Sequence, residues 1–114
     1  MAWTADIGRR GEEIAARFLC NRGWQIKARN YRLGKKEIDI IAEKNGQISL
    51  FEIKTRHNQT DRAVISRRQQ HNLRQAHLEF CEQNKLTPVQ VDYRLIVINY
   101  DHGWAKLTCC LNFL

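Results

Sequence analysis

Long apolar runs are absent from this chain of 114 residues. No stretch approaches the roughly 20 consecutive hydrophobic residues that a membrane-spanning helix needs. The first residues, which read MAWTADIGRRGEE, lack the hydrophobic segment of a secretory signal peptide. We therefore expect a cytoplasmic protein that has no membrane partner.

Spacings typical of zinc sites and disulfide frameworks are missing as well. The four cysteines include no C-x-x-C pair, and the four histidines include no H-x-x-x-H pair. In a cytoplasmic protein, such cysteines are expected to be reduced and to lie in the hydrophobic core. The histidines give no candidate metal site, and we expect His77 to be partly buried with its polar atoms satisfied.

Acidic residues are the scarcer charged class, with 12 Asp and Glu against 19 Lys and Arg and a net charge of +7. Such an excess favours a polyanionic partner, of which nucleic acid is the most usual. Repeats, low-complexity tracts and linkers are absent, and the length suffices for one hydrophobic core but not for two. We expect residues 1–114 to form a single domain.

Residues 36–56 carry the clearest structural signal, because Asn45-Gly46 separates two runs in which apolar and polar residues alternate. An Asn-Gly pair in this setting predicts a β-hairpin with a two-residue turn. The turn places Lys44 opposite Gln47, and every further pair of facing residues follows from that register.

This register places Asp39 opposite Glu52 and Glu37 opposite Lys54. Because side chains alternate along a strand, these four residues are expected on one face of the sheet. The other face is expected to be apolar and to carry Ile38, Ile40, Ala42, Phe51 and Ile53.

Two facing carboxylates, such as Asp39 and Glu52, destabilise a strand pair unless a positive charge lies between them. A hard divalent cation such as magnesium takes oxygen ligands and is commonly held by one or two carboxylates with waters and phosphates. The pair therefore predicts a metal site, and without metal it is expected to keep one carboxyl protonated near neutral pH. The alternative interpretation is a set of solvated ion pairs, of which Glu37 with Lys54 would be an ordinary example.

A first helix is predicted from Thr4 to Arg22. Its apolar stripe consists of Ile7, Ile14, Phe18 and Leu19. Small residues around Glu12, among them Gly11 and Ala15, would let this helix approach the sheet closely and carry Glu12 to it. The alternative is that Glu12 is a solvated surface acid.

The remaining elements follow from periodicity and turn signals. Strands are predicted at Trp24–Tyr31, Val89–Tyr100 and Trp104 to about Asn112, a polar loop at Thr55–Val64, and a second helix from Ser66 to about Asn84. Ser66 and Gln69 predict a capping box at the start of that helix. The order is therefore helix, three strands, helix and two strands.

Basic residues gather in the polar loop and at the start of the second helix, where they suit phosphate contacts. They are Arg56, Arg62, Arg67 and Arg68. Gln69 lies four residues before Leu73 on the apolar stripe of that helix, so its polar side chain can face a site rather than the core.

Glu12 on a helix, Asp39 on a strand and Glu52-Ile53-Lys54 on the next strand match the ordered pattern of the PD-(D/E)XK nuclease superfamily. The sequence resembles more closely the YraN family of small, uncharacterised bacterial proteins. That family is similar to archaeal Holliday junction resolvases and to the catalytic domain of tRNA-splicing endonucleases. The shared motifs are GxxGExxA at 8–15, Asn30-Tyr31-Arg32, EIDII at 37–41 and FEIKTR at 51–56. The resemblance covers residues 7 to 100, approximately.

The resemblance implies a mixed α/β fold of the restriction-endonuclease type, in which helices flank a central mixed β-sheet. It implies Asp39, Glu52 and the Ile53 carbonyl as metal ligands, with Lys54 orienting or activating the attacking water. The hairpin register, which is derived without the resemblance, brings together the same carboxylate pair.

Glu12 would then bind a second metal or hold one of its waters, and Glu37 would support the set. Two positions depart from the family pattern. Gln69 stands where the family tends to carry a lysine, and Asp92-Tyr93-Arg94 stands where it tends to read Arg-Phe-Asp. Neither departure affects the metal ligands.

Residues and resemblance together favour a magnesium-dependent endonuclease, with manganese as the other candidate cofactor. DNA is favoured over RNA as the nucleic-acid partner, and branched structures such as Holliday junctions are among the candidate substrates. Related resolvases act as dimers, which makes a homodimer a candidate assembly. The main alternative is a nucleic-acid-binding module that keeps the fold with little or no catalysis. A third is a protein-interaction domain whose basic charge serves a ribosomal or membrane-surface partner.

Overall fold

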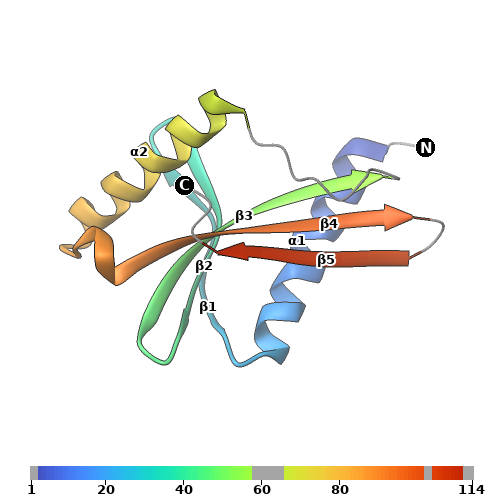
Figure 1. Ribbon diagram of the computed structural model, residues 1–114, viewed down its shortest axis with the longest axis horizontal. Coiled ribbons are helices and arrows are strands. Elements are labelled where there is room, and N and C mark those ends of the chain that lie inside the picture. Colours follow the sequence, from blue (N-terminus) through green and yellow to red (C-terminus); the bar gives the residue numbers. More distant parts are fainter. Residues whose placement is uncertain (1–2, 58–65, 102–103, 112–114) are drawn as a thin grey trace.

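The chain folds in the predicted order of a helix, three strands, a helix and two strands. The computed structural model describes residues 3–57, 66–101 and 104–111 and is shown in Figure 1. The elements are α1 (Trp3–Asn21), β1 (Gln25–Leu33), β2 (Lys36–Lys44), β3 (Gln47–His57), α2 (Arg67–Gln83), a short 3-10 helix (Pro88–Gln90), β4 (Val91–Asp101) and β5 (Trp104–Leu111). The first three residues of the predicted polar loop extend β3, and residues 58–64 of that loop lie outside the described residues.

The five strands form one sheet in the order β1-β2-β3-β4-β5. β3 and β4 pair in parallel because α2 connects them as a crossover, whereas the other neighbouring strands pair antiparallel. The expected mixed α/β fold with a central mixed sheet is thus confirmed. Figure 1 shows a strong twist, in which β1 and β2 turn away from the direction of β4 and β5. Neither described helix is long and apolar enough to cross a membrane.

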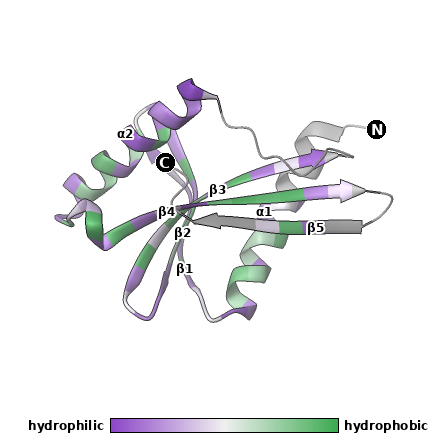
Figure 2. Cartoon of the chain, viewed as in Figure 1, coloured by the Kyte–Doolittle hydropathy of each residue, from purple (hydrophilic) through white to green (hydrophobic). Residues whose placement is uncertain are grey.

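Two hydrophobic cores lie on opposite faces of this sheet, one under each helix. Neighbouring residues of β3 alternate between them, with Leu50 in the core under α2 and Phe51 in the core under α1. The helices contribute Ala15, Ala16 and Leu19 from α1, and Leu73, Ala76, Phe80 and Cys81 from α2. Figure 2 shows the hydrophobic middle of β4 between the helices and the hydrophilic first turn of α2.

The predicted hairpin between β2 and β3 is confirmed. Asn45 and Gly46 have φ values of 52° and 81°, which are the left-handed values that a type I′ turn requires. Lys44 faces Gln47, and the ladder keeps the predicted register as far as the pair of Ile40 and Phe51.

Beyond that pair, a side chain replaces the backbone ladder between the two strands. The Asp39 carboxylate accepts a hydrogen bond from the backbone N–H of Ile53, with an N···Oδ2 distance of 2.8 Å. Asp39 thereby occupies the place in which a carbonyl of β2 would otherwise bind β3. The two strands part here, and the predicted neighbours Asp39 and Glu52 meet through their side chains.

The break in the ladder also changes the alternation of β2. Ile38 packs with Ile41 and Leu50 in the core under α2, whereas Ile40 packs under α1. The prediction that Ile38 shares a face with Ile40 was therefore wrong. Strict alternation assumes an unbroken strand, and β2 is irregular at Asp39.

Small residues bring α1 close to the sheet, as predicted. Gly11 is buried, and a Cβ built on it would overlap the methyl group of Thr55 on β3. Ile14 and Phe18 of the predicted apolar stripe are only half-buried, because the small side of the helix makes the closest approach. Glu12 follows Gly11 and reaches the sheet with it.

Local predictions for α2 are confirmed, and one strand boundary is not. Ser66 Oγ accepts from the Gln69 N–H, and Gln69 Oε1 accepts from the Ser66 N–H, each at 3.1 Å. His77 is half-buried, with its Nε2 2.8 Å from the Val91 carbonyl oxygen. Val89, predicted to begin a strand, lies in the 3-10 helix and is 89% exposed.

The cysteine prediction holds for one described side chain and fails for another. Cys81 is a buried free thiol in the core under α2, as expected. Cys20 is also a free thiol but is exposed, because it lies on the outer face of α1. The side chains of Cys109 and Cys110 lie outside the described part of the chain.

Gly11→Ala is expected to destabilise the protein by about 1–3 kcal/mol, although alanine favours a helix over glycine by about 1 kcal/mol, because the added methyl group would overlap Thr55. In a Thr55→Ser background, which lacks that methyl group, the same substitution should become neutral or stabilising. Urea unfolding of the two single variants, the double variant and wild type measures both effects. If Gly11→Ala were as stable as wild type, the contact between α1 and β3 would not be tight.

Candidate functional site

Three carboxylates from α1 and β2 gather beside the sheet. They belong to Glu12, Glu37 and Asp39, and one oxygen of each lies within 4.8 Å of the other two. Asn30 of β1 joins them. With its amide nitrogen facing the carboxylates, it donates to Glu12 Oε1 and to Glu37 Oε1, each at 3.2 Å. The structure thus brings Glu12 to β2, as the small residues of α1 predicted.

Glu52 approaches Asp39 from β3 on the other side. The Asp39 carboxylate lies close enough to Glu52 for its charge to raise the pKa of Glu52, and Glu52 Oε1 lies 3.3 Å from Lys54 Nζ. The Glu52 and Lys54 side chains are only 15% and 21% exposed. Asp39 therefore links the Glu12 and Glu37 carboxylates to the pair formed by Glu52 and Lys54.

Ile53 presents its backbone to the same junction. Its N–H donates to Asp39, and in an extended strand the carbonyl of a residue points to the same side as its N–H. The Ile53 carbonyl therefore faces the opening between β2 and β3. This orientation is compatible with the predicted role of the carbonyl as a metal ligand.

Burial raises the pKa of Glu52 to about 7, with the charge of Asp39 adding to the increase and Lys54 opposing it. Burial also raises the pKa of Asp39, although the hydrogen bond from Ile53 lowers it. The expectation that one carboxyl of the pair stays protonated near neutral pH agrees with these shifts. Burial, rather than the repulsion that the sequence suggested, is the larger cause.

Burial likewise raises the pKa of Glu12, and the neighbouring charges of Asp39 and Glu37 add to the increase while Arg29 opposes it. The carboxylates of the site are therefore partly buried and short of positive charge. The atoms available here as metal ligands are all carboxylate or carbonyl oxygens. Mg²⁺ and Mn²⁺ prefer oxygen ligands, whereas softer metals prefer sulfur or nitrogen. The residues present fit a hard divalent cation.

A cavity of about 230 Å³ adjoins the carboxylates between β2, β3 and α2. Its lining consists of Lys35, Lys36, Glu37, Glu52, Lys54, Gln69, Asn72, Leu73 and Ala76. Lysines and amides surround an apolar floor, and one lysine, Lys36, binds Glu79 at 2.9 Å. Since one water takes about 30 Å³, the cavity can hold a phosphate group together with several waters.

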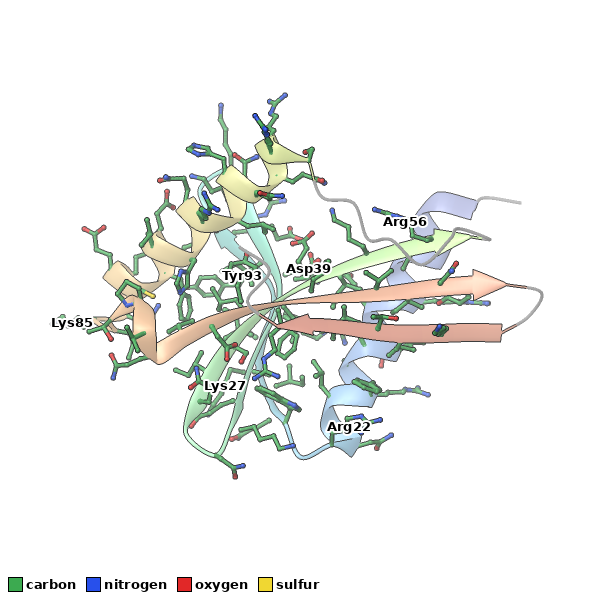
Figure 3. All side chains as sticks on the ribbon, in the orientation of Figure 1. Arg22, Lys27, Asp39, Arg56, Lys85 and Tyr93 are labelled. Carbon is green, nitrogen blue, oxygen red and sulfur yellow. The ribbon has the colours of Figure 1, made fainter. Side chains whose placement is uncertain are left out.

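The residues predicted to contact nucleic acid do not all reach this cavity. Gln69 lines it while its Oε1 caps α2. Arg67 and Arg68 precede Gln69 on the exposed first turn of α2, outside the lining. Arg56 lies further along β3, where Figure 3 shows it near the start of α1 and away from Asp39.

Four residues of the site were not predicted as functional: Asn30, Lys35, Lys36 and Asn72. Lys35 and Lys36 carried a usable signal, because they directly precede the predicted acidic strand. Asn72 follows Gln69 by three residues, which places both on one face of a helix. Asn30 carries no such signal beyond its place in the Asn30-Tyr31-Arg32 motif, because its contacts depend on how β1 pairs with β2.

Glu52→Gln is expected to stabilise the metal-free protein by on the order of 1–3 kcal/mol above pH 7. The pKa of Glu52 is about 7 in the folded protein against 4.5 for an ordinary Glu, so the wild type loses stability as pH rises from 4.5 to 7. The advantage of the variant should therefore vanish near pH 4.5. Urea unfolding at pH 4.5, 6 and 8 measures this dependence.

The exposed Glu82 on α2 provides the control, because Glu82→Gln removes a carboxylate outside the site. Its effect on stability should be small at every pH. A Glu52→Gln advantage that did not change with pH would contradict the raised pKa.

Comparison with known proteins places the chain among bacterial relatives. A relative from Chloroherpeton thalassium is 39% identical over 96 residues, which cover 81% of this chain and 72% of that protein. A relative from Phocaeicola vulgatus is 45% identical over 58 residues, which cover 51% of this chain and 48% of that protein. Both are described as UPF0102 proteins. The matched part spans about half the length of several of these relatives.

One solved structure, that of Pyrococcus furiosus SfsA in complex with Ca²⁺, covers 90% of this chain and 60% of its own with 14% identity. Its TM-score of 0.41 is too low to support an argument about fold or function. The family model described as "Uncharacterised protein family UPF0102" matches residues 11–99, which include every candidate ligand. The chain therefore belongs to the UPF0102 family, as its resemblance to YraN proteins had indicated.

Proposed function

We propose that the protein is a magnesium- or manganese-dependent endonuclease that hydrolyses phosphodiester bonds in nucleic acid. The observation that carries this proposal is the meeting of Asp39 and Glu52 with Lys54 beside a cationic cavity. Burying two carboxylates close together costs free energy, and a purely structural role would not offset that cost. The proposal also accounts for Glu12 and Glu37, which bring further carboxylates to the same point.

When bound, a divalent cation would lower the pKa of a coordinated water and neutralise charge that develops on the phosphate. Asp39, Glu52 and the Ile53 carbonyl would hold it, and Glu12 and Glu37 would hold a second cation or its waters. The protein supplies these oxygens from strands β2 and β3 and from helix α1, which are rigid elements.

Lys54 places a positive charge beside Glu52, with its ammonium 3.3 Å from Glu52 Oε1. Because the ammonium lines the cavity, it can orient a water for attack and donate to the phosphate oxygens. Its low exposure strengthens both interactions, since little water competes for it.

Nucleic acid is the proposed substrate because basic side chains gather around the cavity. Lys35 and Lys36 line it on one side, and the exposed Arg67 and Arg68 begin α2 beside Gln69. Lysine and arginine side chains position a phosphodiester backbone without reading its sequence. We propose DNA, branched DNA included, ahead of RNA.

Metal binding is the first test. Calorimetry with Mn²⁺ and Mg²⁺ should show binding to wild type and loss of binding, or affinity at least tenfold weaker, in Asp39→Asn. Asp92→Asn is the matched control, because Asp92 forms its ion pair with Arg94 outside the site. Its metal affinity should equal that of wild type.

Cleavage of labelled branched, duplex and single-stranded DNA and RNA should then depend on the metal. Lys54→Ala should bind metal but cleave on the order of 100-fold more slowly, as expected for loss of one electrostatic stabiliser. If wild type binds neither metal, even with nucleic acid present, the nuclease proposal fails. A nucleic-acid-binding module without catalysis would then replace it, since the surrounding cations serve either function.

Lys35→Ala should weaken binding of nucleic acid and lower the slope of log affinity against log salt by about one unit, as expected for one lost phosphate contact. Fluorescence anisotropy with a labelled oligonucleotide across a series of salt concentrations measures the slope. Arg17→Ala is the control, because Arg17 is 79% exposed on α1 and pairs with Glu13. An equal change in both variants would mean that net charge alone governs binding.

A further inference from the structure

Asn30 occupies the position on β1 that faces Asp39. The neighbouring ladder pairs are Arg29 with Ile40 and Tyr31 with Ile38. Asn30 itself has a φ of 52°, in the left-handed region that asparagine tolerates better than most residues. This backbone conformation interrupts β1 opposite the residue at which β2 parts from β3.

The side chain of Asn30 connects two carboxylates from different elements. With its amide nitrogen turned toward the two carboxylates, the orientation that satisfies both amide atoms, Asn30 donates to Glu12 Oε1 on α1 and to Glu37 Oε1 on β2, each at 3.2 Å. An amide has two N–H donors, so each carboxylate receives one of them. A single planar group thereby sets the spacing between Glu12 and Glu37.

The neutrality of Asn30 matters for this arrangement. A lysine or arginine in its place would neutralise the carboxylates and compete with a metal for them. The two nearby arginines do not form close ion pairs with these carboxylates. Arg29 binds Glu13 instead, at 3.0 Å, and Arg32 approaches Glu37 only to 4.0 Å. The amide holds the carboxylates together while leaving their charge available to a cation.

We propose that Asn30 is a positioning residue that holds Glu12 and Glu37 at the spacing required for binding a divalent cation with Asp39. The inference rests on the proposed metal site and extends it to a residue that touches neither metal nor substrate. Groups that orient metal ligands commonly change metal affinity by tenfold or more when they are removed.

Asn30→Gly tests the amide, because glycine adopts the left-handed φ without strain and removes only the side chain. In calorimetry with Mn²⁺, the variant should bind roughly tenfold more weakly than wild type. Asn45→Gly is the matched control, since Asn45 has the same φ of 52° in the hairpin turn. It should leave the affinity for Mn²⁺ unchanged, and both variants should keep the urea midpoint of the metal-free wild type.

A double-mutant cycle separates positioning from a general structural effect. In a Glu37→Gln background, Asn30→Gly should weaken Mn²⁺ binding less than threefold, because one of the two carboxylates that Asn30 holds is already gone. A tenfold loss in that background would overturn the inference. So would a weaker affinity that came with a lower metal-free urea midpoint, which would indicate a structural role.

The outcomes also distinguish this inference from the proposed function. Unaltered Mn²⁺ binding by Asn30→Gly, with normal binding by wild type and loss in Asp39→Asn, would overturn the inference alone. Absence of binding by wild type would overturn the proposed function and this inference with it.

Discussion

The hydrogen bond between the Ile53 N–H and the Asp39 carboxylate is the interaction on which the arrangement of the site depends. A buried N–H without an acceptor costs about 1–3 kcal/mol, so β3 can leave the ladder of β2 only if another acceptor takes its place. Asp39 supplies that acceptor. Its carboxylate thus satisfies the backbone and stands where Glu52 and the Ile53 carbonyl meet it.

The site that results is electrostatically unfavourable in the absence of a cation. Glu12, Glu37, Asp39 and Glu52 account for four of the 12 acids in a protein of net charge +7. Burial raises the pKa of Glu12, Asp39 and Glu52, which shows that the folded protein disfavours their charged forms. Proteins tolerate such local instability mainly at functional sites, where a ligand relieves it.

Two features of the fold bring the groups together. The close approach of α1 at Gly11 carries Glu12 to the carboxylates of β2, because no side chain of Gly11 separates the helix from Thr55. The parallel pairing of β3 and β4 requires α2 as a crossover, and this helix closes the cavity over Glu52 and Lys54. Each helix thus adds a wall or a ligand to a centre that the strands define.

The sequence by itself determined the order of the elements, the hairpin register and the capping box of α2, because turn residues, alternation and capping act over a few residues. It also selected Asp39, Glu52 and Lys54 as neighbours, since a two-residue turn propagates a register along both strands. It could not reveal that the ladder ends at Asp39, because a side chain that replaces a backbone acceptor breaks the periodicity from which the register was derived.

Only the tertiary structure decided the positions of Asn30, Lys35 and Asn72 around the site. Asn30 meets Glu12 and Glu37 through the pairing of β1 with β2 and the packing of α1, contacts between segments that local patterns do not specify. The exposure of Cys20 was missed for the same reason, because composition predicts an average environment and packing assigns each residue its own.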